Sequence, residues 1–120
     1  MFDGPEPIYL QIAEHLRDQI LTGALAEGDQ VMSTTQFATT YRINPATAAK
    51  AFGLLVAEDV IYKQRGVGMF VADGARERLR EHRRGAFYTD HLDAVLAEAQ
   101  RLGISTSDLI RYIEQKDTRA

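Results

Sequence analysis

The sequence predicts a mainly α-helical fold with one small β-hairpin. Three patterns support this. Apolar residues recur at helical spacing near the N-terminus, two capped helices follow closely within residues 33–58, and two strand-forming runs flank a glycine turn at 64–68. The chain has 120 residues, of which 45% are hydrophobic and 26% charged, which is typical of a small folded domain. It contains no cysteine, so disulfides and thiolate metal sites are excluded.

The first predicted helix covers residues 7–22. Pro7 suits the first turn of a helix, and Gly23 provides a stop. After it we predict a loop over residues 23–30, followed by a buried Val31. The apolar face of the helix recurs every four residues and consists of Ile8, Ile12, Leu16 and Ile20.

Two closely spaced helices are predicted next. Ser33, with Gln36 three residues later, forms a capping box that marks a helix start. Asn44 followed by Pro45 marks a second start, because asparagine caps a helix and proline fits its first position. This second helix extends to about Glu58 and has a predicted inner face of Ala48, Ala51, Phe52, Leu55 and Val56. Two capped helices joined by a tight turn form the helix-turn-helix pattern.

A β-hairpin is predicted after the helix pair. Its strands are residues 60–63 and 69–71, and the turn between them contains Gly66 and Gly68. A helix-turn-helix followed by a hairpin is a winged helix. Residues 1–73 are therefore predicted to form a winged helix-turn-helix DNA-binding domain.

Residues 74–120 are predicted to form a helical arm. The cationic stretch 75–84 has helical propensity, and Gly85 is expected to interrupt it, by bending one helix or separating two. Ser105 or Thr106 caps a last short helix. The arm is too small for a large core, so we interpret its apolar stripe as a dimerisation surface, with folding back onto the winged helix as the alternative. The stripe consists of Phe87, Leu92, Val95, Leu96, Ala99, Leu102, Leu109, Ile110 and Ile113.

Catalysis has little support in the sequence. No nucleophile, phosphate-binding or metalloprotease motif occurs. His91 with Asp90 and Asp93 can be drawn as a metal site, but the three lack a known ligand spacing, so a solvated helix face is the favoured interpretation. We predict no enzyme activity, no catalytic residue, no metal and no cofactor. No apolar run is long enough to cross a membrane.

DNA contacts have better support. The start of the second helix of such a motif enters the major groove, and small side chains there let the backbone approach the base edges. The start of the preceding helix offers N–H groups and hydroxyls to a phosphate, and cations on the wing suit the minor groove or backbone. Ser33 and Asn44 can also be plain caps, which is compatible with phosphate contact. The candidate DNA-binding residues are Ser33, Thr34, Thr35, Gln36, Arg42, Asn44, Ala46, Thr47, Lys50, Lys63, Arg65, Gly66 and Gly68.

These residues resemble the GntR family of bacterial transcription regulators. The resemblance covers residues 7–71 and rests on Pro7–Ile12, Ile20–Leu25, Gly28–Asp29, Ile43–Thr47 and Arg65–Val71. The Asn44-Pro45 start and the short two-helix tail resemble the YtrA-type subgroup. This implies a homodimeric repressor of an inverted-repeat, double-stranded DNA operator, in the bacterial cytoplasm and associated with the nucleoid. The tail leaves room for a small-molecule effector of unidentified chemistry.

Several positions depart from the family pattern. Val31–Ser33 stands where the family usually has Leu-Pro-Ser, and Thr35 and Ala49 stand where arginines are common. Residues 1–73 carry five Lys and Arg against nine Asp and Glu, so the cations for DNA are few. These features favour, as the alternative, a winged-helix protein-interaction module that has lost DNA binding. A small hydrolase built on the metal site drawn above is a third interpretation.

Overall fold

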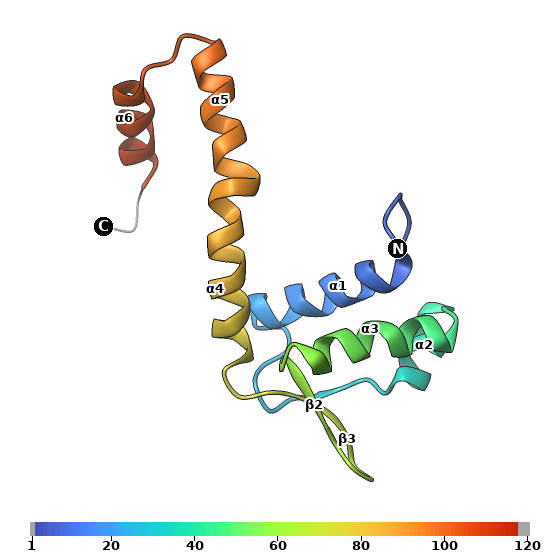
Figure 1. Cartoon of the computed structure of the whole chain (residues 1–120). Coiled ribbons are helices and arrows are strands. Elements are labelled where there is room, and N and C mark those ends of the chain that lie inside the picture. The colour runs from blue at the N-terminus through green and yellow to red at the C-terminus, as the bar shows by residue number, and fades with distance from the viewer. Residues whose placement is uncertain (1, 118–120) are drawn as a thin grey trace. The chain divides into compact units, whose positions relative to one another are not determined.

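The computed structural model describes residues 2–117 (Figure 1). Its contacts divide the chain into two compact units: unit 1 ends at Glu81 and unit 2 begins at His82. The mainly helical fold with a small antiparallel sheet confirms the predicted fold class. The elements are α1 (Ile8–Thr22), β1 (Gln30–Val31), α2 (Thr34–Tyr41), α3 (Pro45–Ala57), β2 (Ile61–Gln64), β3 (Gly68–Val71), α4 (Ala75–Phe87), η1 (Tyr88–Leu92), α5 (Asp93–Arg101) and α6 (Thr106–Lys116).

The core of unit 1 lies between its helices and its sheet. The apolar face predicted for α1 is confirmed from Ile12 onward, whereas Ile8 is 44% exposed at the start of the helix. The inner face predicted for α3 is buried except for Val56, where the prediction was wrong. Val56 lies at the edge of that face, because each residue advances 100° around a helix, and it is 40% exposed. The buried side chains of α1 and α3 are Ile12, Ala13, Leu16, Ile20, Ala48, Ala51, Phe52 and Leu55.

The sheet has three antiparallel strands in the order β1-β3-β2. Ile61 pairs with Val71, and both are buried, so this pair ties the base of the hairpin to the helices. The predicted hairpin is confirmed, but β1 falls in a segment predicted as a loop. Gln30 of β1 pairs with Phe70, and Val31 is buried as expected. A strand this short has no pattern of its own and exists because β3 pairs with it.

The predicted caps of α2 and α3 are confirmed. Ser33 Oγ accepts from the Gln36 N–H at 3.1 Å, and Gln36 Oε1 accepts from the Ser33 N–H at 3.0 Å, which completes the capping box. Asn44 Oδ1 accepts from the Ala46 N–H at 2.8 Å, and Pro45 takes the first helical position. These bonds begin α2 and α3 at the expected residues.

The first turns of α4 belong to unit 1. Arg76 Nε donates to the Leu21 carbonyl at 3.0 Å, and Arg78 donates to the carbonyls of Asp59 at 2.6 Å and Asp73 at 2.8 Å. Part of the cationic stretch therefore binds carbonyls at the ends of α1 and α3. This explains why unit 1 continues past residue 73.

Gly85 does not interrupt its helix, and that prediction was wrong. α4 continues through Gly85 to Phe87, and the irregularity is the π-helical turn η1, after which α5 begins. A glycine inside a helix costs only about 1 kcal/mol relative to alanine, which the surrounding helix tolerates. Ser105 Oγ caps α6 by accepting from the Asp108 N–H at 3.1 Å. No helix among the described residues is both long and apolar enough to span a bilayer.

Candidate nucleic-acid interface

The turn between α2 and α3 is fixed by backbone geometry and aromatic packing. Arg42 ends α2 with a φ of 54°, and the next amide, that of Ile43, donates to the Ala38 carbonyl at 2.9 Å. Phe37 packs against Tyr41 and against Phe52 of α3, with ring centroids 4.5 and 5.6 Å apart. These contacts hold the two helices as a pair, as a helix-turn-helix requires.

All thirteen candidate DNA-binding residues lie at the surface. Ten are exposed, and Thr34, Thr47 and Gly68 are half-buried. They come from three places in unit 1: the start of α2, the turn with the first half of α3, and the wing formed by β2, β3 and residues 65–67. Whether each touches DNA stays a prediction.

The two capping side chains keep hydrogen-bonding capacity for a ligand. Ser33 accepts through Oγ and can still donate its hydroxyl proton, and Asn44 accepts through Oδ1 and can still donate from its amide nitrogen. In an α-helix the first N–H groups have no intrahelical acceptor, which applies to Thr34 and Thr35. The start of α2 thus presents donors suited to an anion such as phosphate.

The exposed side of α3 carries small side chains. Ala46, Ala49 and Gly53 are exposed there, so the helix backbone is accessible to a partner. Lys50 is also exposed, but its ammonium lies over the Tyr9 ring of α1, 4.0 Å from the centroid. Tyr9 was not among the candidate site residues. The contact joins two helices, and nothing in the local sequence around Lys50 signals it.

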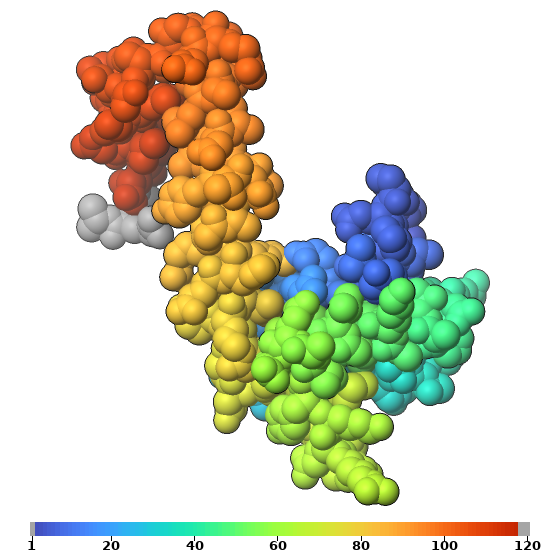
Figure 2. Space-filling model, in the orientation of Figure 1, coloured from blue at the N-terminus to red at the C-terminus, as the bar shows by residue number. Residues whose placement is uncertain are grey.

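The wing is a tight glycine turn carried by two strands. The Val67 N–H donates to the Gln64 carbonyl at 2.9 Å, which closes a four-residue turn with Arg65 and Gly66 at its tip. Gly66 has a φ of 77°. A type II β-turn requires such a positive φ at its third position, which favours glycine there. The wing, yellow-green in Figure 2, projects from the rest of unit 1.

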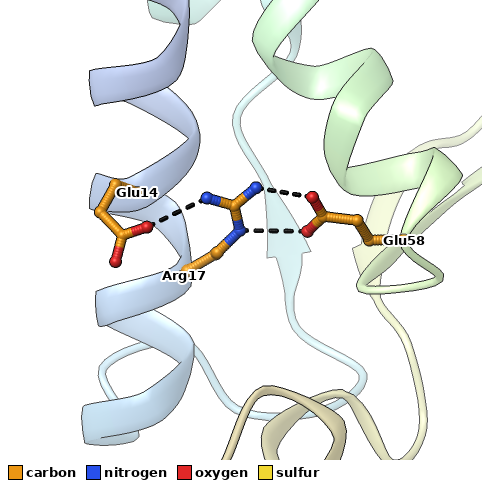
Figure 3. Close-up of polar contacts among 3 residues, drawn as sticks. All are labelled: Glu14, Arg17 and Glu58. Atoms are coloured by element: carbon orange, nitrogen blue, oxygen red, sulfur yellow. Dashed lines mark hydrogen bonds and ion pairs between the residues drawn. The ribbon is translucent and has the colours of Figure 1, made fainter. Parts of the chain in front are cut away.

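An ion-pair cluster holds the far end of α3 against α1 (Figure 3). Arg17 of α1 donates from Nε to Glu58 Oε1 at 3.0 Å and from a terminal nitrogen to Glu58 Oε2 at 2.6 Å. Its other terminal nitrogen reaches Glu14 Oε2 at 3.0 Å. Glu58 is the C-cap residue of α3, so this two-bond contact helps to set the direction of the helix that carries the candidate DNA contacts.

The apolar stripe of unit 2 is largely exposed. Leu92 and Leu109 are half-buried, and Ala99 is buried within the unit. The exposed members are Phe87, Val95, Leu96, Leu102, Ile110 and Ile113.

The residues drawn as a metal site do not converge. Asp90 contacts the Thr89 hydroxyl at 3.4 Å, and the His91 ring lies 6.1 Å from that of Phe87. Across residues 2–117, no group of three His, Cys, Asp or Glu side chains is arranged to hold a metal ion.

A capped helix pair followed by a glycine-tipped hairpin defines a winged helix-turn-helix, a class of domain that binds DNA. Residues 8–71 match the family model described as bacterial regulatory proteins, gntR family. The chain therefore belongs to the gntR family. It is a DNA-binding transcription regulator of the YtrA type and not an enzyme.

Several relatives span most or part of the chain. The HTH-type transcriptional repressor YtrA of Bacillus subtilis (strain 168) is 28% identical over 109 residues, which is 91% of this chain and 83% of that protein. The crystal structure of a transcriptional regulator from Oenococcus oeni is 27% identical with a TM-score of 0.81, covering 96% of this chain and 94% of that one. The AraR DNA-binding domain in complex with operator ORX1 is 27% identical with a TM-score of 0.56, covering 60% and 93%.

Proposed function

We propose that this regulator is a homodimeric repressor that binds an inverted-repeat operator. In each protomer, α3 from Asn44 onward enters the major groove, and the wing from Arg65 to Gly68 meets the backbone or the minor groove. The observation that carries this proposal is the exposed first half of α3, with its small side chains. The start of α2 supplies donors for a phosphate at the same interface.

The homodimer is supported by the exposed apolar face of unit 2. Among the described residues of this unit, Ala99 is the only buried hydrophobic residue. Leu96, Ile110 and Ile113 are 46%, 51% and 60% exposed, which is a large apolar surface for so small a unit. A second copy of the same face can cover it through a twofold interface. Two wings and two α3 helices then meet DNA as a symmetric pair, which is why the operator is expected to be an inverted repeat.

Repression is proposed because the relatives that match most of this chain include one named as a repressor, YtrA of Bacillus subtilis. A protein that binds an operator is located on the bacterial chromosome, so association with the nucleoid is part of the proposal. A small-molecule effector would act by favouring one spacing of the two α3 helices, which must match the half-sites of the operator.

The test is selection of double-stranded DNA fragments by the purified protein, with fluorescence anisotropy at two salt concentrations and sequencing of the retained fragments. We expect one inverted repeat to be enriched. The slope of log affinity against log salt is expected to be about −5 to −7 for a dimer in which three or four cations per protomer meet phosphates. Sedimentation of the same sample gives the oligomeric state. A stable dimer without salt-dependent DNA affinity would instead support the protein-interaction module.

A further inference from the structure

The tip of the wing is held by a side chain from the other edge of the sheet. Gln30 lies on β1, and its Nε2 donates to the Val67 carbonyl at 3.2 Å. Gln30 pairs with Phe70, so its side chain lies on the same face of the sheet as position 68, which precedes Phe70 by two residues on β3. A side chain from one edge of the sheet thus reaches the turn that closes the hairpin.

Gly68 makes room for this contact. A Cβ atom at position 68 would overlap the carboxamide nitrogen of Gln30, and Gly68 has a φ of 143°, which side-chain-bearing residues rarely adopt. The carboxamide therefore occupies the space that any other residue at position 68 would fill. The glycine serves the packing of Gln30 as well as the path of the backbone.

The hydrogen bond from Gln30 to Val67 lies close in the chain to Arg65, the cation at the tip of the wing. The residue whose carbonyl Gln30 binds, Val67, also donates the hydrogen bond that closes the turn around Arg65 and Gly66. A hairpin tip with few buried contacts opens readily, so a bond from a neighbouring strand limits its motion. A preordered tip loses less conformational entropy when it meets DNA.

We propose that Gln30 is a positioning residue for DNA binding: its carboxamide holds the turn from Gln64 to Gly68 and thereby directs Arg65. This inference rests on the proposed function, in which Arg65 contacts DNA. The hydrogen bond of the Gln30 side chain goes to the wing, at the Val67 carbonyl. Its role differs from that of the cations, because removing it loosens the tip without removing a charge.

The variant that tests this is Gln30→Met, which keeps the side-chain length and the neutral charge but has no N–H group. The matched control is Gln64→Met, the same change on β2, where the side chain makes no hydrogen bond within residues 2–117. The first readout needs no DNA: ¹⁵N heteronuclear NOEs at Gly66 and Val67 in the free protein. The second is the affinity for the duplex enriched in the selection above, measured with Arg65 intact and in an Arg65→Ala background.

We expect Gln30→Met to lower the NOEs at Gly66 and Val67 and to weaken binding by about two- to tenfold, the range for one neutral hydrogen bond. In the Arg65→Ala background the same change should cost less than about twofold, because both residues act through one contact. The Gln64→Met variant should leave the NOEs unchanged. If Gln30→Met does not fold, Gln30→Leu removes the same donor without altering the backbone of the wing and should loosen the same two amides.

Unchanged NOEs in Gln30→Met would overturn the positioning role. An equal loss of affinity with and without Arg65 would also overturn it, because Gln30 would then act on DNA independently. Failure of the proposed function has a different signature: the wild-type protein itself would bind no duplex in a salt-dependent manner. That result overturns the DNA part of both proposals, whereas the NOEs still report on the wing alone.

Discussion

Replacing either side of the Arg17–Glu58 ion pair should destabilise the protein, but by unequal amounts. Arg17→Met leaves the Glu58 carboxylate at the C-terminal end of α3, where the helix dipole disfavours negative charge, and leaves Glu14 without its arginine contact. Glu58→Gln removes that unfavourable charge and leaves Arg17 paired with Glu14 at 3.0 Å. The arginine variant should therefore lose more stability.

The magnitude follows from the geometry. The Arg17 side chain is 18% exposed and that of Glu58 is 40% exposed, so the pair lies between a surface pair, at about 0.2–1 kcal/mol, and hydrogen bonds to buried charges, at about 1.5–3 kcal/mol. We expect Arg17→Met to cost about 1.5–2 kcal/mol and Glu58→Gln about 0.5–1 kcal/mol. For a small domain, each kcal/mol lowers Tm by about 4–8 °C.

The assay is urea unfolding at one fixed protein concentration, with and without added salt. A fixed concentration is needed because the stability of an oligomer depends on it. The control is Arg101→Met, which removes an exposed pair with Glu98 one helical turn away and should change stability by less than about 0.5 kcal/mol. Added salt screens the charges, so it should reduce the difference in free energy of unfolding between Arg17→Met and Glu58→Gln. Equal losses in Arg17→Met and Glu58→Gln, or a larger loss in Glu58→Gln, would refute the reasoning.

The remaining predictions concern DNA, the arm and one strained residue. Lys50→Ala should weaken DNA binding and reduce the slope of log affinity against log salt concentration by about one per protomer. An unchanged affinity and slope would contradict the proposed DNA face. Leu96→Glu should sediment as a monomer, while the control Ala97→Glu, one position further around the helix and outside the apolar stripe, stays dimeric; a dimeric Leu96→Glu protein would exclude this face as the interface. Asp59→Gly should raise the free energy of unfolding by about 0.5–1 kcal/mol, because Asp59 has a φ of 60° and Arg78 binds only its backbone carbonyl. A loss of stability in urea would assign a role to the Asp59 side chain.

The parts of the fold that were predicted well depend on short-range chemistry. The capping box of Ser33 and Gln36 joins residues three apart, and the Asn44 cap joins residues two apart. The hairpin follows from strand formers on either side of Gly66. In each case the atoms that form the bond are neighbours along the chain, so the residue types alone indicate the geometry.

The sequence-based predictions that were wrong or missing concern features that depend on contacts with distant parts of the chain. Gly85 is a helix breaker by propensity, yet the helix continues through it and is irregular at η1 instead. Val56 continues an apolar pattern, but no element of unit 1 covers it as fully as its neighbours. β1 is two residues long, and its pairing partners lie about forty residues away on β3. Propensity cannot register a partner at that distance in the chain.

The sequence by itself determined the order of the helices, the helix-turn-helix, the wing and the family, because periodicity, caps and turn glycines are local and the family motifs are read residue by residue. Only the tertiary structure decided which side chains meet across elements. The contacts of Lys50 with Tyr9, Arg17 with Glu58 and Gln30 with the wing each join residues more than thirty apart. Such contacts form because the core brings distant helices and strands together, and that packing is a property of the whole domain.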